Sequence, residues 1–297
     1  MTQTSHIQAF NSCEHLIQND RMLAGLTTFK IGGPAEFYAA PETIEEAKQL
    51  IDFAHSAEIS IRLLGGGSNI LVSDEGVTGL VLHLKHLRWC EVRNEQLHVG
   101  PGYSLPRLAK LAAKQGIAGF DRFAGIPGYV GGMLRTNSGG RHGTLSDVLH
   151  SVALMRPDGK FETRRTVEFE FGHRTSNLRD EFALDFIFNI RHDSPDLLWE
   201  RHCEIMKGKI ASQPLNEKNA GCIFRNPPGD HAARLIDISG LKGHRIGGAR
   251  VSPDHANFIC NESEASASDV LRLIDHVRET VFRETGIELE LEVIRWP

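Results

Sequence analysis

The sequence predicts a mixed fold of helices and strands, arranged in two or three compact units. Three observations lead to this prediction: a length of 297 residues, helical and strand patterns that follow one another along the chain, and a change of pattern near residue 195. A single core does not suit a chain of this length, because single hydrophobic cores stop growing at roughly 250–300 residues.

The first predicted elements are a helix and the strands that follow it. Thr43 and Glu46 have the spacing of a capping box, and the apolar residues after them recur on one helical face, so a helix is expected to begin at Thr43. Three apolar strands are expected next, over residues 59–64, 70–72 and 80–84. The first of these strands leads directly into a glycine loop at residues 65–69.

A second helix is expected between Ser104 and Gly116. Pro106 lies in its first turn, where a missing backbone N–H costs nothing, and Gly116 ends the apolar pattern. A second glycine loop follows at residues 125–132, with the sequence GIPGYVGG.

The C-terminal part predicts two helices and a final strand. The first helix is expected over residues 197–210, and the loop at Gln213 and Pro214 after it suits a domain boundary. A second helix, with an apolar stripe over 270–281, is ended by Gly286. A strand is then expected over 287–294, where apolar residues alternate with glutamates.

The composition favours a soluble globular protein that acts on small molecules. Apolar residues make up 40% and charged residues 24% of the chain. No membrane span or signal-peptide pattern is visible, so we expect a cytoplasmic protein without membrane contact. The net charge of -5 gives no electrostatic reason to bind nucleic acid. The five cysteines are scattered and form no CxxC pair, so neither a disulfide framework nor a metal site is predicted.

The two glycine loops are the strongest local signal for a ligand. In the loop GGGSN at residues 65–69, several backbone N–H groups can surround one anion, because residues without Cβ let the chain curl closely. A tight turn between two strands is the alternative interpretation. The loop also lacks the GxGxxG dinucleotide pattern. Two such loops about 60 residues apart nevertheless favour one extended diphosphate ligand between two subdomains.

Longer motifs connect these loops to a known family. The N-terminal half contains TTFKIGGPA at 27–35, LLGGGSNILVSDEG at 63–76 and GIPGYVGG at 125–132. The C-terminal half contains GCIFRNP at 221–227, VSPDHANF at 251–258 and LELEV at 289–293. In sequence, order and spacing these motifs resemble those of the UDP-N-acetylenolpyruvoylglucosamine reductases, the MurB family, over roughly residues 19 to 293.

The resemblance implies an α+β fold: a two-subdomain FAD-binding domain of the PCMH/vanillyl-alcohol-oxidase type and a C-terminal α+β substrate domain. The expected division is 1–85 for the first FAD-binding subdomain, 86–195 for the second and 196–297 for the substrate domain. It also implies that FAD is held non-covalently, that NADPH donates hydride, and that the substrate is UDP-N-acetylglucosamine enolpyruvate, reduced to UDP-N-acetylmuramate for peptidoglycan. The length resembles the shorter type within the family, and we expect a monomer.

The resemblance places the flavin against the two glycine loops and the segment TNSGG. The cofactor-binding residues expected on this basis are Gly65, Gly66, Gly67, Ser68, Asn69, Gly125, Ile126, Pro127, Gly128, Val130, Gly131, Gly132, Asn137, Ser138 and Gly139. TNSGG replaces the family's usual MNAGAYG, so contacts made there by the backbone should persist better than contacts made by side chains.

Arg174 is the expected partner of the substrate carboxylate. The stretch from Phe169 to Ser176 matches a family motif in which this arginine holds the carboxylate where negative charge develops. A planar guanidinium suits that task, because it can donate two parallel hydrogen bonds. His173 stands where the family usually has tyrosine.

Cys222 is the expected proton donor. It occupies the position of a serine in most members of the family, and a thiol with an ordinary pKa of about 8.5 is mostly protonated at neutral pH. The thiol also suggests sensitivity to peroxide. A small buried core cysteine is the alternative interpretation.

Glu292 is expected to act as the acid beside the substrate, since it matches the glutamate of the family's LEPEV motif, although Leu291 replaces the proline. A carboxyl group next to the substrate carboxylate should have a raised pKa. Arg225, Asn226, His255 and Asn257 are the expected substrate-binding residues. Arg225 replaces the commoner lysine.

Two other functions fit part of these observations. A related flavin oxidase would share the FAD-binding domain, but the GCIFRNP and HANF runs belong to the reductases. A paralogue that binds a UDP-sugar or flavin without turnover would explain His173, Cys222 and TNSGG. Retention of Arg174 and Glu292 argues against it.

Overall fold

The computed structural model describes residues 13–140, 142–172, 175–178 and 181–297. It divides into two compact units. Unit 1 comprises Met1–Asn19, Phe37–Gly66 and Thr78–Lys207, and unit 2 comprises Asp20–Glu36, Gly67–Val77 and Gly208–Pro297. Arg174 and His173 lie outside the described residues.

Unit 1 contains the first predicted helix and strands. Helix α2 spans Ile44–Ser56, and strands β3 (Ile61–Leu64) and β5 (Val77–His83) pair in parallel. The helix begins as predicted, because the Thr43 hydroxyl accepts a 3.1 Å hydrogen bond from the Glu46 N–H. The Glu46 carboxylate accepts from the Glu42 N–H at 2.7 Å, one residue before the position that a capping box would use.

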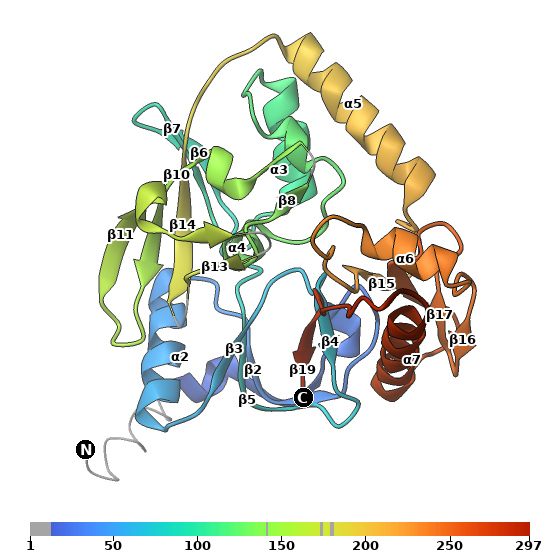
Figure 1. Cartoon of the computed structure of the whole chain (residues 1–297). Coiled ribbons are helices and arrows are strands. Elements are labelled where there is room, and N and C mark those ends of the chain that lie inside the picture. The colour runs from blue at the N-terminus through green and yellow to red at the C-terminus, as the bar shows by residue number, and fades with distance from the viewer. Residues whose placement is uncertain (1–12, 141, 173–174, 179–180) are drawn as a thin grey trace. The chain divides into compact units, whose positions relative to one another are not determined.

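Two further strands complete this sheet, which has the order β1-β2-β5-β3. They are β1 (Ile17–Met22) and β2 (Pro34–Ala39). Strands β2, β3 and β5 of this sheet are labelled in Figure 1. Strand β5 is buried at every position except Thr78. On one of its faces, Leu80 and Leu82 lie in a core cluster with apolar residues of α2. Burial on both faces produces a continuous apolar run, as parallel strands usually show.

A five-stranded antiparallel sheet is the second sheet of unit 1. Its order is β11-β10-β14-β7-β6. The strands are β6 (Cys90–Arg93), β7 (Gln96–Val99), β10 (Leu149–Met155), β11 (Phe161–Arg165) and β14 (Phe182–Asn189). Phe186 and Phe188 on β14 lie in a core cluster with Phe120 and Phe123. Helix α3 (Leu105–Lys114) packs on this core and is followed by Gly116 at φ +70°, which confirms the predicted helix.

The end of the second glycine loop is helical, which the sequence did not predict. Helix α4 spans Val130–Arg135, so two of its first three residues are glycines. Glycine is unfavourable in helices, but Val130, Met133 and Leu134 are buried and the packing gain outweighs this preference. Two short hairpins follow, formed by β8 (Gly139–Gly140) with β9 (Gly143–Thr144) and by β12 (Phe171–Gly172) with β13 (Thr175–Ser176).

Unit 2 is built around a four-stranded sheet of order β15-β18-β17-β16. The strands are β15 (Asn219–Cys222), β16 (Arg245–Ile246), β17 (Ala249–Val251) and β18 (Phe258–Asn261), and the helices are α6 (Ala232–Ile238) and α7 (Ala267–Thr285). Helix α7 ends at Gly286, φ +72°, as predicted. Helix α5 (Pro195–Ser212) starts in unit 1 and ends in unit 2.

The last predicted strand, over residues 287–294, is wrong in extent. Only β19 (Ile294–Trp296) is a strand, and it pairs in parallel with β4 (Ile70–Val72). The alternation of burial is present, since Leu289 and Val293 are buried while Glu290 is exposed. Irregular hydrogen bonds to residues 223–225 and one isolated bridge take the place of a regular ladder.

Two N-terminal segments belong to the same unit as the C-terminal part. Residues 20–36 and 67–77 group with residues 208–297. The predicted division at residues 85 and 195 stays a prediction. No helix in the described ranges is long and apolar enough to cross a membrane.

Candidate functional site

The start of the first predicted glycine loop, Gly65 and Gly66, lies against the second loop inside unit 1. A Cβ atom added to Gly66 would lie 2.6 Å from the Gly128 Cα, and one added to Gly65 would lie 4.0 Å from the Gly132 nitrogen. In the described chain, neither the Gly66 N–H nor the Gly128 N–H donates to a protein acceptor. Closely apposed backbone with unused N–H groups is the arrangement that binds phosphate oxygens.

A buried histidine that sequence reasoning missed lies beside both loops. His83, at the end of β5, is 4% exposed, and its Nδ1 lies 2.8 Å from the Tyr38 hydroxyl. Its ring stacks near Tyr129 of the second loop at a centroid distance of 6.2 Å. Burial, and to a lesser extent the charge of Lys85, lowers the pKa of His83 to about 4, although the Gly65 backbone opposes the shift.

His83 is therefore neutral at physiological pH. Its Nε2 is buried and has no partner of normal hydrogen-bond geometry in the described chain. The tyrosine in the GIPGYVGG motif, Tyr129, is the sequence signal that could have indicated an aromatic contact for a ring beside the loops. Nothing in the sequence places His83 next to it, because the contact joins residues far apart in the chain.

The segment TNSGG, at residues 136–140, is held in place by hydrogen bonds of the Asn137 side chain. Asn137 has φ +38°, and its side-chain oxygen accepts a 3.1 Å hydrogen bond from the Ser146 N–H. Its Nδ2 donates to the Gly172 carbonyl at 3.4 Å, at the β12–β13 hairpin. The Asn137 side chain thus links this segment to Ser146 and to Gly172. The backbone N–H groups of Asn137 and Ser138 donate to the Leu134 and Met133 carbonyls, so they are used within the protein.

Cys222 and Glu292 lie on neighbouring segments of unit 2. Cys222 ends β15, and the Glu292 N–H donates a 2.8 Å hydrogen bond to the carbonyl of Ile223, the next residue. Both side chains are half-buried. The structure therefore brings together two of the three residues predicted to be catalytic, and the third, Arg174, is outside its description.

The four predicted substrate-binding residues fall into two groups. Asn257 is 3% exposed and its amide is used twice by Phe224, accepting from the N–H at 2.9 Å and donating to the carbonyl at 2.7 Å. Asn226 accepts a 3.0 Å bond from the Ala232 N–H, at the start of α6. Asn257 thus holds the backbone two residues after Cys222, and Asn226 holds the start of α6.

Arg225 and His255 retain nitrogens that protein groups do not use. In the described part of the chain, Arg225 Nε and His255 Nδ1 are buried without a hydrogen-bond partner. Burial lowers the pKa of His255, so its ring is neutral at pH 7. Buried polar atoms without a protein partner are uncommon, and these two are suited to a polar ligand.

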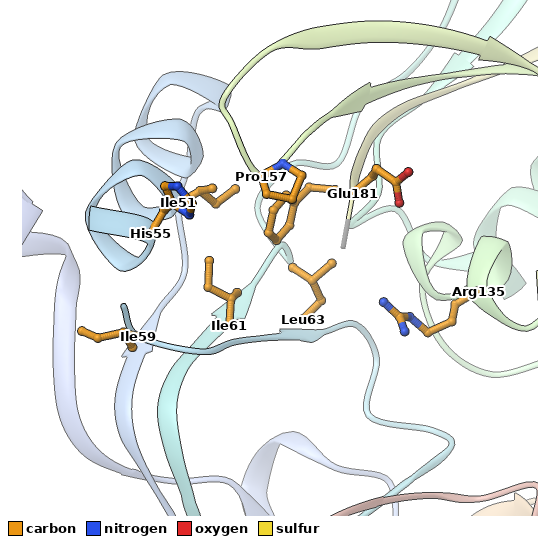
Figure 2. Close-up of a pocket in the computed structure, with 9 residues that line it drawn as sticks. Ile51, His55, Ile59, Ile61, Leu63, Arg135, Pro157 and Glu181 are labelled. Atoms are coloured by element: carbon orange, nitrogen blue, oxygen red, sulfur yellow. The ribbon is translucent and has the colours of Figure 1, made fainter. Parts of the chain in front are cut away.

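Unit 1 also contains a cavity of about 230 Å³ that the sequence did not predict. Ile51, Ile61 and Leu63 form part of its apolar wall, and Arg135 and Glu181 supply charged groups. Figure 2 shows the Arg135 side chain directed toward the cavity. None of the residues predicted to bind the cofactor lines it.

No group of three potential metal ligands occurs among the described histidine, cysteine, aspartate and glutamate residues. The apposed loops, by contrast, fit a flavin dinucleotide. The contact between Gly66 and Gly128 leaves no room for side chains, and the free N–H groups suit a diphosphate.

Comparisons with known proteins agree with this geometry. Residues 35–164 match a family model described as an FAD binding domain, and residues 213–296 match the C-terminal domain of UDP-N-acetylenolpyruvoylglucosamine reductase. The UDP-N-acetylenolpyruvoylglucosamine reductase of Moorella thermoacetica is 39% identical over 91% of this chain and 90% of its own length. The reductase of Listeria monocytogenes serovar 1/2a is 36% identical over 93% of this chain and 94% of its own.

Comparison with a solved structure shows that the similarity extends from the sequence to the fold. The crystal structure of UDP-N-acetylenolpyruvylglucosamine reductase (MurB) from Thermus caldophilus has a TM-score of 0.83 and 37% identity, and the match covers 93% of this chain and 97% of that one. The predicted fold class, an α+β protein with an FAD-binding domain and a C-terminal α+β domain, is confirmed.

Proposed function

The chain belongs to the family of the UDP-N-acetylenolpyruvoylglucosamine reductases, the MurB family, and on that premise we propose the roles of its own residues. It is an FAD-dependent oxidoreductase that uses NADPH to reduce UDP-N-acetylglucosamine enolpyruvate to UDP-N-acetylmuramate, in peptidoglycan precursor synthesis. The observation that carries the assignment is the match to a UDP-N-acetylenolpyruvoylglucosamine reductase over 91% of the chain. The two family models include both glycine loops, within residues 35–164, and Cys222, within residues 213–296.

Bound FAD supplies hydride transfer from NADPH to the enolpyruvyl carbon. We propose that loops 65–69 and 125–132 hold its diphosphate through backbone N–H groups, with the backbone of residues 137–139 beside the ring. The contact between Gly66 and Gly128 supports this proposal, because it aligns two sets of donors without side chains between them.

Arg174 is proposed to hold the substrate carboxylate. Negative charge develops there as hydride arrives, and a guanidinium placed in advance stabilises that charge more than it stabilises the ground state. The proposal rests on the motif from Phe169 to Ser176, whose flanking residues form the β12–β13 hairpin.

Cys222 is proposed to donate the proton, from Sγ, to the carbon next to the one that receives hydride. Glu292 is proposed to bind the substrate carboxylate region as the protonated acid. The hydrogen bond that joins Glu292 to the residue after Cys222 supports a shared site for the two side chains. Arg225 and His255 are proposed to meet polar groups of the UDP-sugar through their unused nitrogens.

We also propose that the protein works in the cytoplasm as a monomer, and that residues 1–85, 86–195 and 196–297 form its two FAD-binding parts and its substrate domain. The cytoplasm suits five cysteines that are not paired in disulfides. Sedimentation and size-exclusion measurements on the FAD-loaded protein test the monomer, for which a mass near 32.9 kDa is expected.

The test of the activity uses purified protein, which should be yellow. NADPH oxidation is expected to depend on UDP-N-acetylglucosamine enolpyruvate and to yield one UDP-N-acetylmuramate per NADPH consumed. An oxidase would instead consume oxygen with an alcohol substrate and no enolpyruvyl compound. A non-catalytic paralogue would bind flavin or UDP-sugar, and no NADPH would be consumed on addition of the substrate.

A further inference from the structure

The first glycine loop is tied to both segments that carry the proton-transfer residues. The loop passes from unit 1 to unit 2 between Gly66 and Gly67, so residues 67–69 are part of the unit that contains Cys222 and Glu292. Within unit 2, side-chain hydrogen bonds run from this stretch to each of the two segments.

Asn69 makes the connection to Glu292. Its Nδ2 donates a 3.2 Å hydrogen bond to the Glu292 carbonyl, and its own carbonyl accepts a 3.0 Å bond from the Ile294 N–H. Pairing of β4 with β19 starts at the residue after Asn69, with Ile70 opposite Ile294. The Asn69 amide donor is therefore used by the protein backbone that presents Glu292.

Thr28 makes the connection to the Cys222 strand. Its N–H donates to the Gly67 carbonyl at 3.0 Å, and its hydroxyl lies 2.7 Å from the carbonyl of Asn219, the first residue of β15. Gly67 has φ +62°, and a Cβ there would lie 2.4 Å from the Leu26 carbonyl oxygen, so only glycine fits at this position. Cys222 is at the other end of β15.

We propose that Asn69 and Thr28 are positioning residues that fix Glu292 and Cys222 relative to the flavin loop. The proposal rests on the proposed function of Glu292 and Cys222. It changes the expected role of Asn69 from a residue that binds the cofactor to one that holds the Glu292 segment in position. Neither side chain takes part in the reaction. The Asn69 side chain donates to the carbonyl of Glu292 itself. The Thr28 hydroxyl donates to the carbonyl of Asn219, on the strand that ends at Cys222.

The expected effect is on geometry rather than on folding. Removal of one hydrogen bond to a backbone carbonyl leaves the fold intact, but a displacement of about 1 Å in a reacting group can slow a step by roughly 100-fold. Proton donation to the substrate should therefore be slowed, while reduction of FAD by NADPH, which requires neither Cys222 nor Glu292, should not.

The test measures the two half-reactions separately by anaerobic stopped-flow mixing of FAD-loaded protein. We expect Thr28→Val and Asn69→Ala to slow reoxidation by UDP-N-acetylglucosamine enolpyruvate by about 10- to 100-fold. Flavin reduction by NADPH and the dissociation constant of FAD should stay within about twofold. Thr28→Ser, which keeps the hydroxyl, should restore most of the rate.

Two controls separate positioning from general destabilisation. Thr285→Val removes a hydroxyl that donates to the Val281 carbonyl at 2.7 Å in the same unit, and it should change neither half-reaction. In a Cys222→Ala background, Thr28→Val should add less than about threefold, because two changes that act through one group are not additive.

An equal slowing of both half-reactions, weaker FAD binding in the Asn69 variant, or full additivity with Cys222→Ala would overturn the proposal. Failure of the proposed function gives a different result, since the wild-type protein itself would then not be reoxidised by the enolpyruvyl substrate.

Discussion

At the scale of single residues, the chemistry depends on whether a thiol serves where the family usually has a hydroxyl. Cys222→Ser should retain substrate reduction, because both groups can donate a proton at the same position. Cys222→Ala should slow substrate reduction by about 100-fold or more, which is within the range of a lost general acid. It should leave flavin reduction by NADPH unchanged. Single-turnover rates of the two half-reactions measure this difference, and normal turnover by the alanine variant would show that another group donates the proton.

His83 makes the stability of the protein depend on pH. Its pKa is lowered from 6.5 to about 4 in the folded state, so the unfolded chain binds more protons between these values. Stability is therefore unaffected above pH 6.5 and falls as the pH decreases from 6.5 toward 4. Between pH 7 and pH 5, the wild type should lose about 2 kcal/mol more free energy of unfolding than His83→Gln, at 1.36 kcal/mol per pKa unit. Urea unfolding at the two pH values measures the loss, and equal losses in both proteins would contradict it.

Which site residues could be predicted depended on whether a motif carried the information. Cys222 and Glu292 could be proposed because each stands within a run of recognisable neighbours. The backbone role of Asn257 was not predicted, since an asparagine in a motif can bind substrate or hold Phe224, and only the contacts distinguish these roles. His83 was missed because burial is what makes it unusual, and the sequence does not show burial.

At the scale of elements, the apposition of the two glycine loops can be tested by adding one methyl group. Gly66→Ala places a Cβ 2.6 Å from the Gly128 Cα, so the backbone must shift. The protein should lose about 1–3 kcal/mol of stability, the usual cost of overpacking, together with FAD affinity. Thermal unfolding of the apoprotein and titration with FAD measure the two effects.

Gly132→Ala and Gly25→Ala are the matched comparisons. Neither added Cβ would have a protein neighbour within 4 Å. Gly132 lies in α4, where FAD is proposed to bind, so its variant should lose FAD affinity without loss of apoprotein stability. Gly25→Ala should change neither quantity. Undiminished FAD binding by both Gly66→Ala and Gly132→Ala would show that FAD does not bind at these loops.

Asp74, at the end of the first glycine motif, supports helix α7 rather than the cofactor. Its carboxylate accepts hydrogen bonds from the Ala267 N–H at 2.8 Å and the Ser268 N–H at 3.1 Å. Asp74→Ala should destabilise the protein by about 1–2 kcal/mol, because two N-terminal N–H groups of the helix lose their acceptor. Chemical denaturation measures the change, and Glu75→Ala, at the exposed next position, is the control. Equal stability of the two variants would show that the cap contributes nothing.

The elements that could be predicted were those with local signals. Helix α3 has both a start signal and a terminating glycine, and it begins and ends near the expected residues. Helix α7 was predicted from an apolar stripe and a terminating glycine, and it ends where expected. Helix α4 begins in glycine-rich sequence, so its formation depends on burial of Val130, Met133 and Leu134 in a core shared with residues distant in the chain. The predicted strand over 287–294 has the correct alternation. It is mostly irregular because its partner, residues 223–225, offers hydrogen bonds at only a few positions.

At the scale of the whole molecule, the order of segments along the chain does not show which segments form each unit. The composition and length predicted two or three units, and two are present, but unit 2 takes residues 20–36 and 67–77 from the N-terminal half. No local pattern marks such an exchange, because the signal is the pairing of β4 with β19 across more than two hundred residues. This exchange is what places the end of the flavin loop in the same unit as Cys222 and Glu292.

The measurement that tests the proposed reaction most directly is anaerobic mixing of FAD-loaded, NADPH-reduced protein with UDP-N-acetylglucosamine enolpyruvate. The yellow absorbance of oxidised flavin should return in step with UDP-N-acetylmuramate, with one product formed per flavin. Protein that holds FAD, accepts hydride from NADPH and then stays reduced in the presence of this substrate, with no product, would contradict the assignment.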